Sequence, residues 1–200
     1  MISLPQTLFL FSFMKFAPVH HFWQSVPLQV RSFLTRALII FVLWKVVYHL
    51  LLFPIHFPDK QLTQLTAKST GYLYSFFVND PLVVNREEVK NGTAKSVIFI
   101  EGRRAIGIAD GCNGLELYVL YIGFLFCLPT TAKRRAVFCL TGIIVIFILN
   151  NFRCFGLAWL YLNNYSIANF AHHYLFKMII YGVIFYGWVL YSKKVAFNEY

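Results

Sequence analysis

Residues 110–128 have the sequence DGCNGLELYVLYIGFLFCL, in which a short polar motif opens a long apolar run. The motif holds Cys112 between two glycines, Gly111 and Gly114. A switch of this kind from polar to apolar residues marks a point where a chain enters a membrane. The stretch therefore places a potential cysteine nucleophile at a membrane boundary.

The composition of the 200-residue chain is that of a membrane protein. It is 58% hydrophobic and 19% aromatic, and only 13% of its residues are charged, which is about half the usual share for a soluble domain. The net charge of +10 does not indicate nucleic acid, because the basic residues lie between apolar runs and not on one face beside stacking aromatics. We expect a lipid bilayer as partner and no nucleic acid.

The cysteine pattern gives no sign of a metal site or a disulfide scaffold. The four cysteines are Cys112, Cys127, Cys139 and Cys154. They show neither CxxC spacing nor the density of a small secreted domain. We expect no metal and no cofactor.

Four stretches approach the length that spans a bilayer. They are residues 33–53, 113–128, 136–152 and 174–191. The second is short and reaches spanning length only if Asp110 and Cys112 lie in the interface. We predict an all-α polytopic membrane protein of about four transmembrane helices, with a small external α+β cap between the first and second.

The organisation of the chain follows from these spans. Residues 1–18 lack the basic start and the small-residue cleavage pattern of a signal peptide, so we interpret them as interfacial or partly inserted. The predicted segments are a cytoplasmic or interfacial N-terminal segment (1–32), the first transmembrane helix (33–53), the external cap (54–111), a three-helix transmembrane core with the candidate catalytic residues (112–192) and a cytoplasmic tail (193–200).

Basic residues set the predicted orientation. By the positive-inside rule, the Lys and Arg residues before the first span, between the second and third, and after the fourth lie in the cytoplasm. Cys112, Arg153 and His172 then all lie at outer ends of spans. We predict a multi-pass protein of the inner (plasma) membrane with its site on the external or periplasmic face. The basic residues used are Lys15, Arg31, Arg36, Lys133, Arg134, Arg135, Lys193 and Lys194.

The external segment has two kinds of pattern. Residues 61–77 (QLTQLTAKSTGYLYSFF) have leucines and aromatics at helical spacing, which indicates an amphipathic helix near the outer leaflet. After turn signals at 79–81 and 91–92, the runs SVIFIEG and RRAIGIADG indicate two short strands around a charged turn. This hairpin would deliver the chain to Cys112.

The three candidate residues suit acyl transfer. Cysteine is nucleophilic as the thiolate, which a helix N-terminus or a nearby cation favours, and Cys112 is expected to begin a helix. His172 can take the thiol proton and return it to a leaving amine. Arg153, with its planar fork of donors, suits an oxyanion or a substrate carboxylate. Alternative or supporting candidates are His173, Glu116 and Asn150.

Each of these residues also has a structural interpretation. A boundary cysteine is often simple packing, a His-His pair is often an interfacial anchor, and the arginine would be a stop residue. Glu116, four residues after Cys112, would orient His172, pair with the arginine or only satisfy its charge. Arg103 and Arg104 would line the substrate entrance or form a solvated turn.

Three motifs together resemble those of the exosortase and archaeosortase family of polytopic membrane proteins, and the resemblance covers about residues 110–191. It implies a cysteine transpeptidase or protease, a hydrolase, that cleaves C-terminal sorting signals from exported proteins. Cys112 would be the nucleophile, Arg153 the oxyanion or substrate anchor and His172 the acid-base residue, with His173 as its alternative. With about four spans the chain resembles a compact branch of the family, such as the F type. The motifs are Cys112-Asn113-Gly114, Asn150-Asn151-Phe152-Arg153 and Ala171-His172-His173-Tyr174.

Two other classes of protein are alternatives. A non-catalytic membrane scaffold or assembly subunit would use the same polar residues as a packing network between helices. A small transporter is disfavoured, because transport sites lie near the bilayer centre and these polar residues gather at one end.

Overall fold

The computed structural model describes residues 26–77, 82–88, 94–100, 102–163 and 165–196. The predictions for residues 1–18 and for the turns at 79–81 and 91–92 lie outside the described residues. In chain order the elements are α2 (Leu28–Val47), the π-helical turn η2 (Tyr48–Leu52), α3 (Phe53–Ile55), α4 (Asp59–Ser75), β1 (Leu82–Glu88), β2 (Ala94–Ile100), β3 (Arg103–Ala109), the 3₁₀ turn η3 (Asp110–Cys112), α5 (Leu115–Cys127), α6 (Ala132–Leu162), α7 (Ala168–Phe170), the π-helical turn η4 (Ala171–Leu175) and α8 (Phe176–Ala196).

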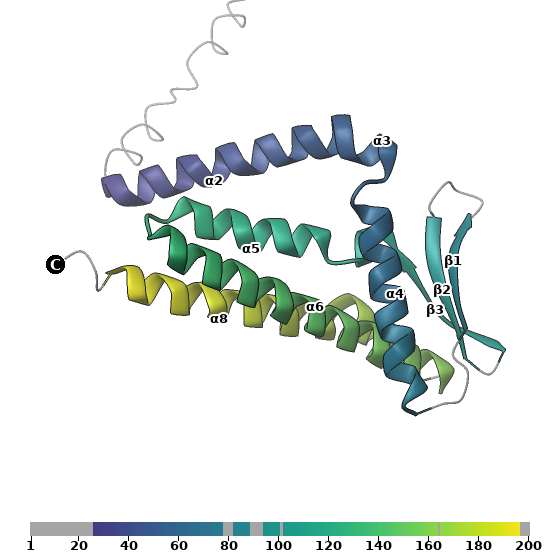
Figure 1. The fold of residues 1–200 in the computed structure, drawn as a ribbon. Helices are drawn as coiled ribbons and strands as arrows, with labels where there is room; N and C mark the ends of the chain where they lie inside the picture. The colour runs from purple at the N-terminus through teal and green to yellow at the C-terminus, as the bar shows by residue number, and fades with distance from the viewer. Residues whose placement is uncertain (1–25, 78–81, 89–93, 101, 164, 197–200) are drawn as a thin grey trace, which may run out of the picture.

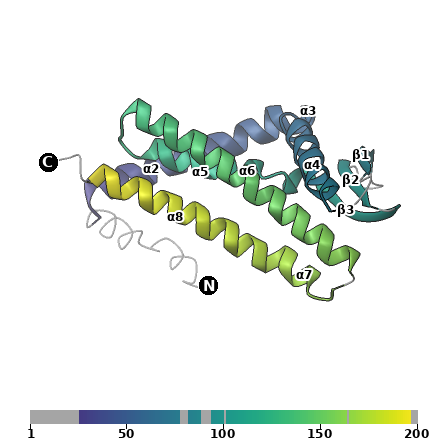
Figure 2. The same cartoon turned by 60° about the horizontal axis from the view of Figure 1, so that its bottom comes forward.

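The long helices form a bundle with a cap at one end. Helices α2, α5, α6 and α8 run along a common direction, while α4 crosses that end of the bundle and the sheet lies beyond it (Figures 1 and 2). The start of α2, the α5–α6 connection and the end of α8 all lie at the opposite end (Figure 1). The predicted helical membrane fold with a small α+β cap is confirmed.

Three helices of the described chain are long and apolar enough to cross a membrane: residues 28–55, 132–162 and 168–193. They correspond to the first, third and fourth predicted spans. Helix α5 is apolar but has 13 residues, or roughly 20 Å at 1.5 Å per residue, against about 30 Å for the hydrocarbon core. Its role as a fourth span stays a prediction.

Helix α6 is longer than the sequence predicts, because it continues to Leu162 and does not end near residue 152. The predicted end rested on the polar motif from Asn150 to Arg153. Asn150 and Asn151 are buried, however, and Asn151 accepts a hydrogen bond from Thr70 of α4 at 3.2 Å. Polar side chains that face protein instead of lipid do not end a membrane helix. Arg153 therefore lies inside α6, more than two turns before its end.

The cap contains the predicted hairpin and one more strand. Strands β2 and β3 pair antiparallel around the turn at residue 102, as the sequence indicated. Strand β1 pairs antiparallel with β2 on its other edge, which gives a three-stranded sheet in the order β1-β2-β3. Strand β3 leads directly into η3, and so into Cys112.

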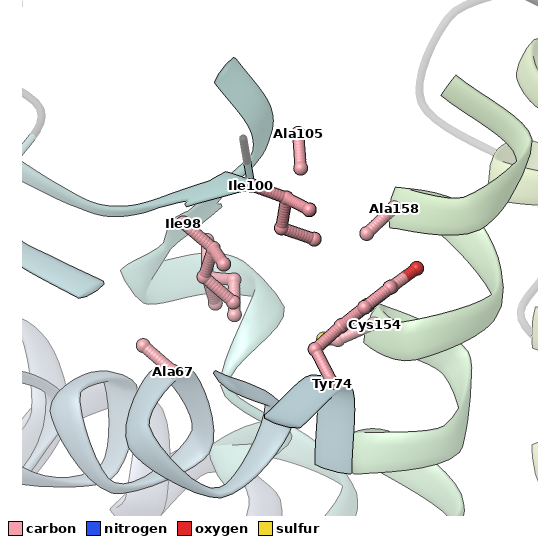
Figure 3. Close-up of a cluster of buried hydrophobic side chains, with 8 residues drawn as sticks. Ala67, Tyr74, Ile98, Ile100, Ala105, Cys154 and Ala158 are labelled. Carbon is pink, nitrogen blue, oxygen red and sulfur yellow. The ribbon is translucent and has the colours of Figure 1, made fainter. Parts of the chain in front are cut away.

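The cap is fixed to the bundle by a buried apolar cluster between α4, the sheet and the extended part of α6 (Figure 3). The ring of Tyr74 of α4 packs at a tilt of 32° against that of Phe155 of α6, with ring centroids 4.5 Å apart, and its hydroxyl donates to the Phe155 carbonyl at 2.9 Å. Burial raises the pKa of Tyr74 to about 12, so the phenol stays protonated and keeps this bond. The cluster consists of Ala67, Tyr74, Ile98, Ile100, Ala105, Ile108, Cys154 and Ala158.

Helix α4 has a buried side of mostly polar and small residues and an exposed side that mixes apolar residues with polar and charged ones, among them Lys60, Gln61 and Lys68. The outward side, with the two residues after the helix, exposes Leu65, Tyr72, Phe76 and Phe77 by 50% to 74%. Exposed leucine and aromatic side chains beside lysines suit a helix that lies at a membrane interface. The helix predicted from residues 61–77 is present as α4, and its place near the outer leaflet stays a prediction. The buried side consists of Asp59, Thr63, Thr66, Ala67, Thr70, Gly71 and Tyr74.

A glycine sets the distance between α5 and α6. A Cβ atom at Gly142 of α6 would overlap the ring of Tyr121 in α5. Small residues at such contacts let membrane helices approach closely. We expect Gly142→Ala to lower the free energy of unfolding by about 1–3 kcal/mol, because the tyrosine ring must move.

The matched control for this prediction is Gly182→Ala in α8, where an added Cβ meets no atom within 4 Å. The measurement is the midpoint temperature of thermal unfolding in detergent. It should fall for Gly142→Ala and stay unchanged for Gly182→Ala. Equal midpoints for the two variants would contradict this account of the α5–α6 contact.

Candidate active site

Cys112 lies in the connection between β3 and α5. It is the last residue of the 3₁₀ turn η3, and its side chain is half-buried. Gly114 follows with a φ of 88°, a conformation that favours glycine. Asn113 Oδ1 accepts a hydrogen bond from the N–H of Leu115, the first residue of α5, at 2.8 Å. The sequence suggested that Cys112 begins the helix. In the structure it lies instead in a hydrogen-bonded turn just before the helix.

One pocket of about 440 Å³ brings together three of the predicted residues, Cys112, Arg153 and His172. Cys112 comes from the turn before α5, Arg153 from α6 and His172 from η4. Residues 104–108 of β3 form a further part of the lining. The remaining lining residues are Cys154, Leu157 and Tyr161 of α6.

Arg153 holds the main chain of Cys112. Its Nη2 donates to the Cys112 carbonyl at 2.6 Å. Asn150, one turn earlier on α6 and completely buried, donates through Nδ2 to the same carbonyl at 3.4 Å. The Nε of Arg153 is buried and has no hydrogen-bond partner among the described residues. Asn150, a supporting candidate from the sequence, is thus in direct contact with the cysteine.

The charge of the pocket is positive. Arg104 and Arg153 line it, and the described lining contains no carboxylate. Cations around a partly enclosed pocket favour an anionic group within it, such as a developing oxyanion or a substrate carboxylate. Of the two arginines expected near a substrate entrance, both are exposed, and Arg104 lines the pocket whereas Arg103 does not.

The structure separates the two histidines. His172 lines the pocket, and its buried Nδ1 has no hydrogen-bond partner in the described part of the chain. His173 is exposed, and its Nδ1 lies 2.9 Å from the Asn169 carbonyl of its own helix. Both belong to the π-helical turn η4, and such turns often occur at functional sites.

Glu116 does not line the pocket of Cys112, Arg153 and His172, and its ion pair is with Lys45 and not with Arg153. Its carboxylate lies 3.4 Å from Nζ of Lys45 in α2, and its side chain is 75% exposed. At the other end of α5, Arg36 of α2 donates to the Cys127 carbonyl at 3.4 Å. Cys112 and Glu116 do not share a helical face, as their spacing had suggested, because the helix begins at Leu115, after the cysteine. Glu116 instead helps to attach α2 to α5.

The remaining cysteines have packing environments. Cys127 is buried, and Cys139 packs against the α5–α6–α8 core, the buried cluster of Tyr121, Leu125, Ile146, Ile180, Ile184 and Tyr191. Cys154 touches the pocket but is only 1% exposed and belongs to the cap cluster. All four cysteines are free thiols. In the described ranges no three His, Cys, Asp or Glu side chains gather as a metal site would require.

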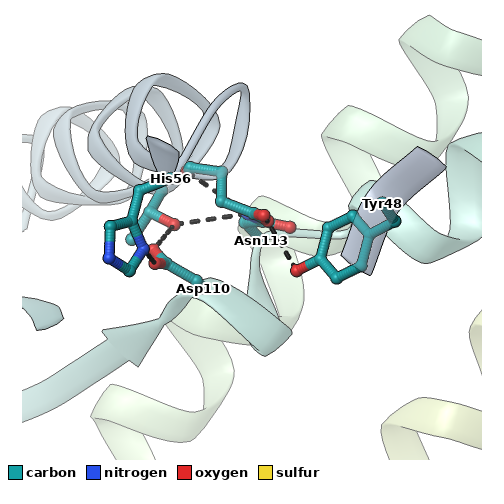
Figure 4. A network of polar contacts seen from close by, with 6 residues as sticks. Tyr48, His56, Asp110 and Asn113 are labelled. Carbon is teal, nitrogen blue, oxygen red and sulfur yellow. Dashed lines mark hydrogen bonds and ion pairs between the residues drawn. The ribbon is translucent and has the colours of Figure 1, made fainter. Parts of the chain in front are cut away.

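A polar network at the Cys112 turn was not found from the sequence (Figure 4). Asp59, the first residue of α4, is only 3% exposed. Its Oδ1 accepts a hydrogen bond from Asn113 Nδ2 at 2.8 Å, and its Oδ2 accepts one from the Tyr48 hydroxyl at 2.9 Å. The network therefore connects η2 and α4 to the residue that follows the cysteine.

Helix α4 also holds the start of the turn. Thr63 donates to Asp110 Oδ1 at 2.8 Å, and His56 Nδ1 lies 3.7 Å from Asp110 Oδ2. A signal for this contact was present in the sequence, because polar residues repeat at helical spacing on the side of α4 that is buried. These residues are Asp59, Thr63, Thr66 and Thr70.

The fold and the pocket together define a polytopic membrane protein with cysteine, arginine and histidine gathered beside its cap. The chain belongs to the transmembrane exosortase family, whose model matches residues 6–192. No curated protein and no solved structure matches the chain. Membership of this family implies, at the level of class, a membrane cysteine peptidase or transpeptidase.

Proposed function

We propose that the protein is a membrane-embedded cysteine transpeptidase or protease that cleaves C-terminal sorting signals of exported proteins. Cys112 is the nucleophile, His172 the acid-base residue and Arg153 the oxyanion or substrate anchor. The observation that carries this proposal is the pocket that these three side chains line in common. In this proposal the pocket faces the exterior of the plasma membrane, as the positive-inside rule predicts.

The chemistry follows from the groups at the pocket. As the Cys112 sulfur attacks the substrate carbonyl carbon, His172 takes the thiol proton. The carbonyl oxygen becomes an oxyanion, which the positive charge of Arg153 stabilises. Collapse of this intermediate breaks the peptide C–N bond, and His172 returns the proton to the leaving amine. The thioester on Cys112 is then resolved by water or by an acceptor nucleophile.

Cleavage of a tagged substrate tests the proposal through Arg153. The substrate is an exported protein that ends in a short motif, an apolar span and a basic tail. We expect Arg153→Ala to lower the cleavage rate about a hundredfold, because it removes a charged donor from the pocket. Arg153→Lys should restore little, because an ammonium group cannot reproduce the planar fork of a guanidinium.

The matched control is Arg36→Ala, which also removes an arginine that donates to a backbone carbonyl, but at the far end of α5. It should leave cleavage unchanged. Membrane abundance must be measured alongside, since a scaffold would lose abundance on substitution of Arg153 without accumulating uncleaved substrate. Full cleavage by Arg153→Ala would contradict its proposed role.

A further inference from the structure

The side chain of Asn113 bridges α5 and α4 immediately after the cysteine. Its Oδ1 accepts from the N–H of Leu115, so its Nδ2 must face the other way. There Nδ2 donates to Asp59 Oδ1 at 2.8 Å, and it lies 3.3 Å from both the main-chain oxygen of Asp59 and the hydroxyl oxygen of Thr63. Asn113 is 1% exposed and Asp59 is 3% exposed. Both ends of the amide are therefore used inside the protein.

The hydrogen bond between Asn113 and Asp59 can form in only one direction, with Asn113 as the donor and Asp59 as the acceptor. Both carboxylate oxygens of Asp59 accept hydrogen bonds, one from Asn113 and one from Tyr48. If an oxygen replaced the amide nitrogen of Asn113, two hydrogen-bond acceptors would face each other, that oxygen and the carboxylate of Asp59. Unmatched acceptors are costly at a buried site, so the backbone would have to move.

Such a movement would reach Cys112, because Asn113 is its neighbour in the chain. The Cys112 main chain is held from α6 by the Arg153 bond to its carbonyl, and from α4 through Asn113. Neither Asp59 nor Asn113 lines the pocket that contains the three candidate catalytic residues. A change in their contact would therefore displace the nucleophile without removing a wall of that pocket.

We propose that Asp59 is a positioning residue that acts through Asn113 to hold the Cys112 thiol in reactive geometry. This inference rests on the proposed function of Cys112 as the nucleophile. It assigns to the cap helix α4 a direct effect on the rate of the chemical step, in addition to its packing against α6. Loss of the contact lowers kcat and leaves KM largely unchanged, because displacement of a reacting group costs rate and not substrate binding.

The test exchanges the two residues. In Asn113→Asp two carboxylates oppose each other, so we expect kcat to fall about tenfold or more. Asp59→Asn serves as the control, because its amide oxygen can accept from Asn113 while its amide nitrogen donates to the Tyr48 oxygen. The double variant Asp59→Asn/Asn113→Asp places donor and acceptor together again with reversed polarity. We expect it to recover most of the wild-type kcat.

The outcomes separate positioning from a purely structural role. A wild-type kcat for Asn113→Asp, or a double variant that remains as slow as Asn113→Asp, overturns the proposal. If Asn113→Asp does not accumulate in the membrane, the double variant decides, because it must both accumulate and cleave. Its failure to do either also overturns the proposal.

A second measurement distinguishes this inference from the proposed function. Alkylation of Cys112 by iodoacetamide, followed by mass spectrometry of its peptide, reports on the thiol without any substrate. We expect Asn113→Asp to change this rate severalfold and the double variant to restore it. If Cys112→Ala cleaved normally, the proposed function would have failed, yet the alkylation rates would still show whether Asp59 positions the thiol.

Discussion

Replacement of Cys112 by alanine should abolish cleavage, by at least about a thousandfold, while the protein still accumulates in the membrane. The structure gives the reason why these two effects separate. Arg153 and Asn150 bind the main-chain carbonyl of residue 112 and not its sulfur. Alanine keeps that carbonyl and removes only the thiol that lines the pocket. The measurement is cleavage of the tagged substrate, normalised to membrane abundance.

Cys139→Ala is the control for this prediction, since Cys139 is also partly exposed but packs against the α5–α6–α8 core. It should cleave at the wild-type rate. Cys112→Ser should be nearly as inactive as alanine, because a hydroxyl is a weak nucleophile without a site built to activate it. Normal cleavage by Cys112→Ala would exclude a cysteine mechanism.

The second large effect is expected at His172. His172→Ala should lower kcat by about a hundredfold to ten-thousandfold, the range that general acid-base catalysis supplies. The buried Nδ1 of His172 has no hydrogen-bond partner among the described residues, so its loss removes no hydrogen bond of that atom. The variant should therefore remain folded, and its melting temperature in detergent should stay close to that of the wild type.

The adjacent histidine provides the control, because His173 differs from His172 in exposure and not in residue type. His173→Ala loses one exposed contact to its own helix and should cleave at nearly the wild-type rate. If His173→Ala were the inactive variant and His172→Ala the active one, the assignment made from the pocket would be wrong.

Hydropathy and turn signals were sufficient for much of the fold. The apolar spans and the β2–β3 hairpin follow from local patterns, and the structure contains them. The end of α6 could not be predicted in this way, because the Asn150–Arg153 motif is polar for a tertiary reason. Its side chains face α4 and the Cys112 turn, and only the folded cap reveals that partner.

The candidate site, like the fold, was predictable from the sequence only in part. Cys112, Arg153 and His172 were identified from residue type and from the shared side of the membrane, and they line one pocket. The choice between His172 and His173 required the structure, since it depends on the rotation of the helix about its axis. Asp59 was missed because an aspartate after a proline looks like an ordinary helix start. Its burial depends on contacts with Tyr48 and Asn113, which are distant in the sequence.

In the proposed orientation, the exposed side chains Leu65, Tyr72, Phe76 and Phe77 form an apolar stripe along and just after α4 at the level of the outer leaflet. A detergent micelle that covers only the middle of the bundle would leave this stripe in water, and two molecules would then bury it against each other. Dimers seen in such a preparation would report missing lipid and not a native oligomer. Nanodiscs, which supply a full bilayer rim at the level of α4, are therefore the appropriate medium in which to measure both association and activity.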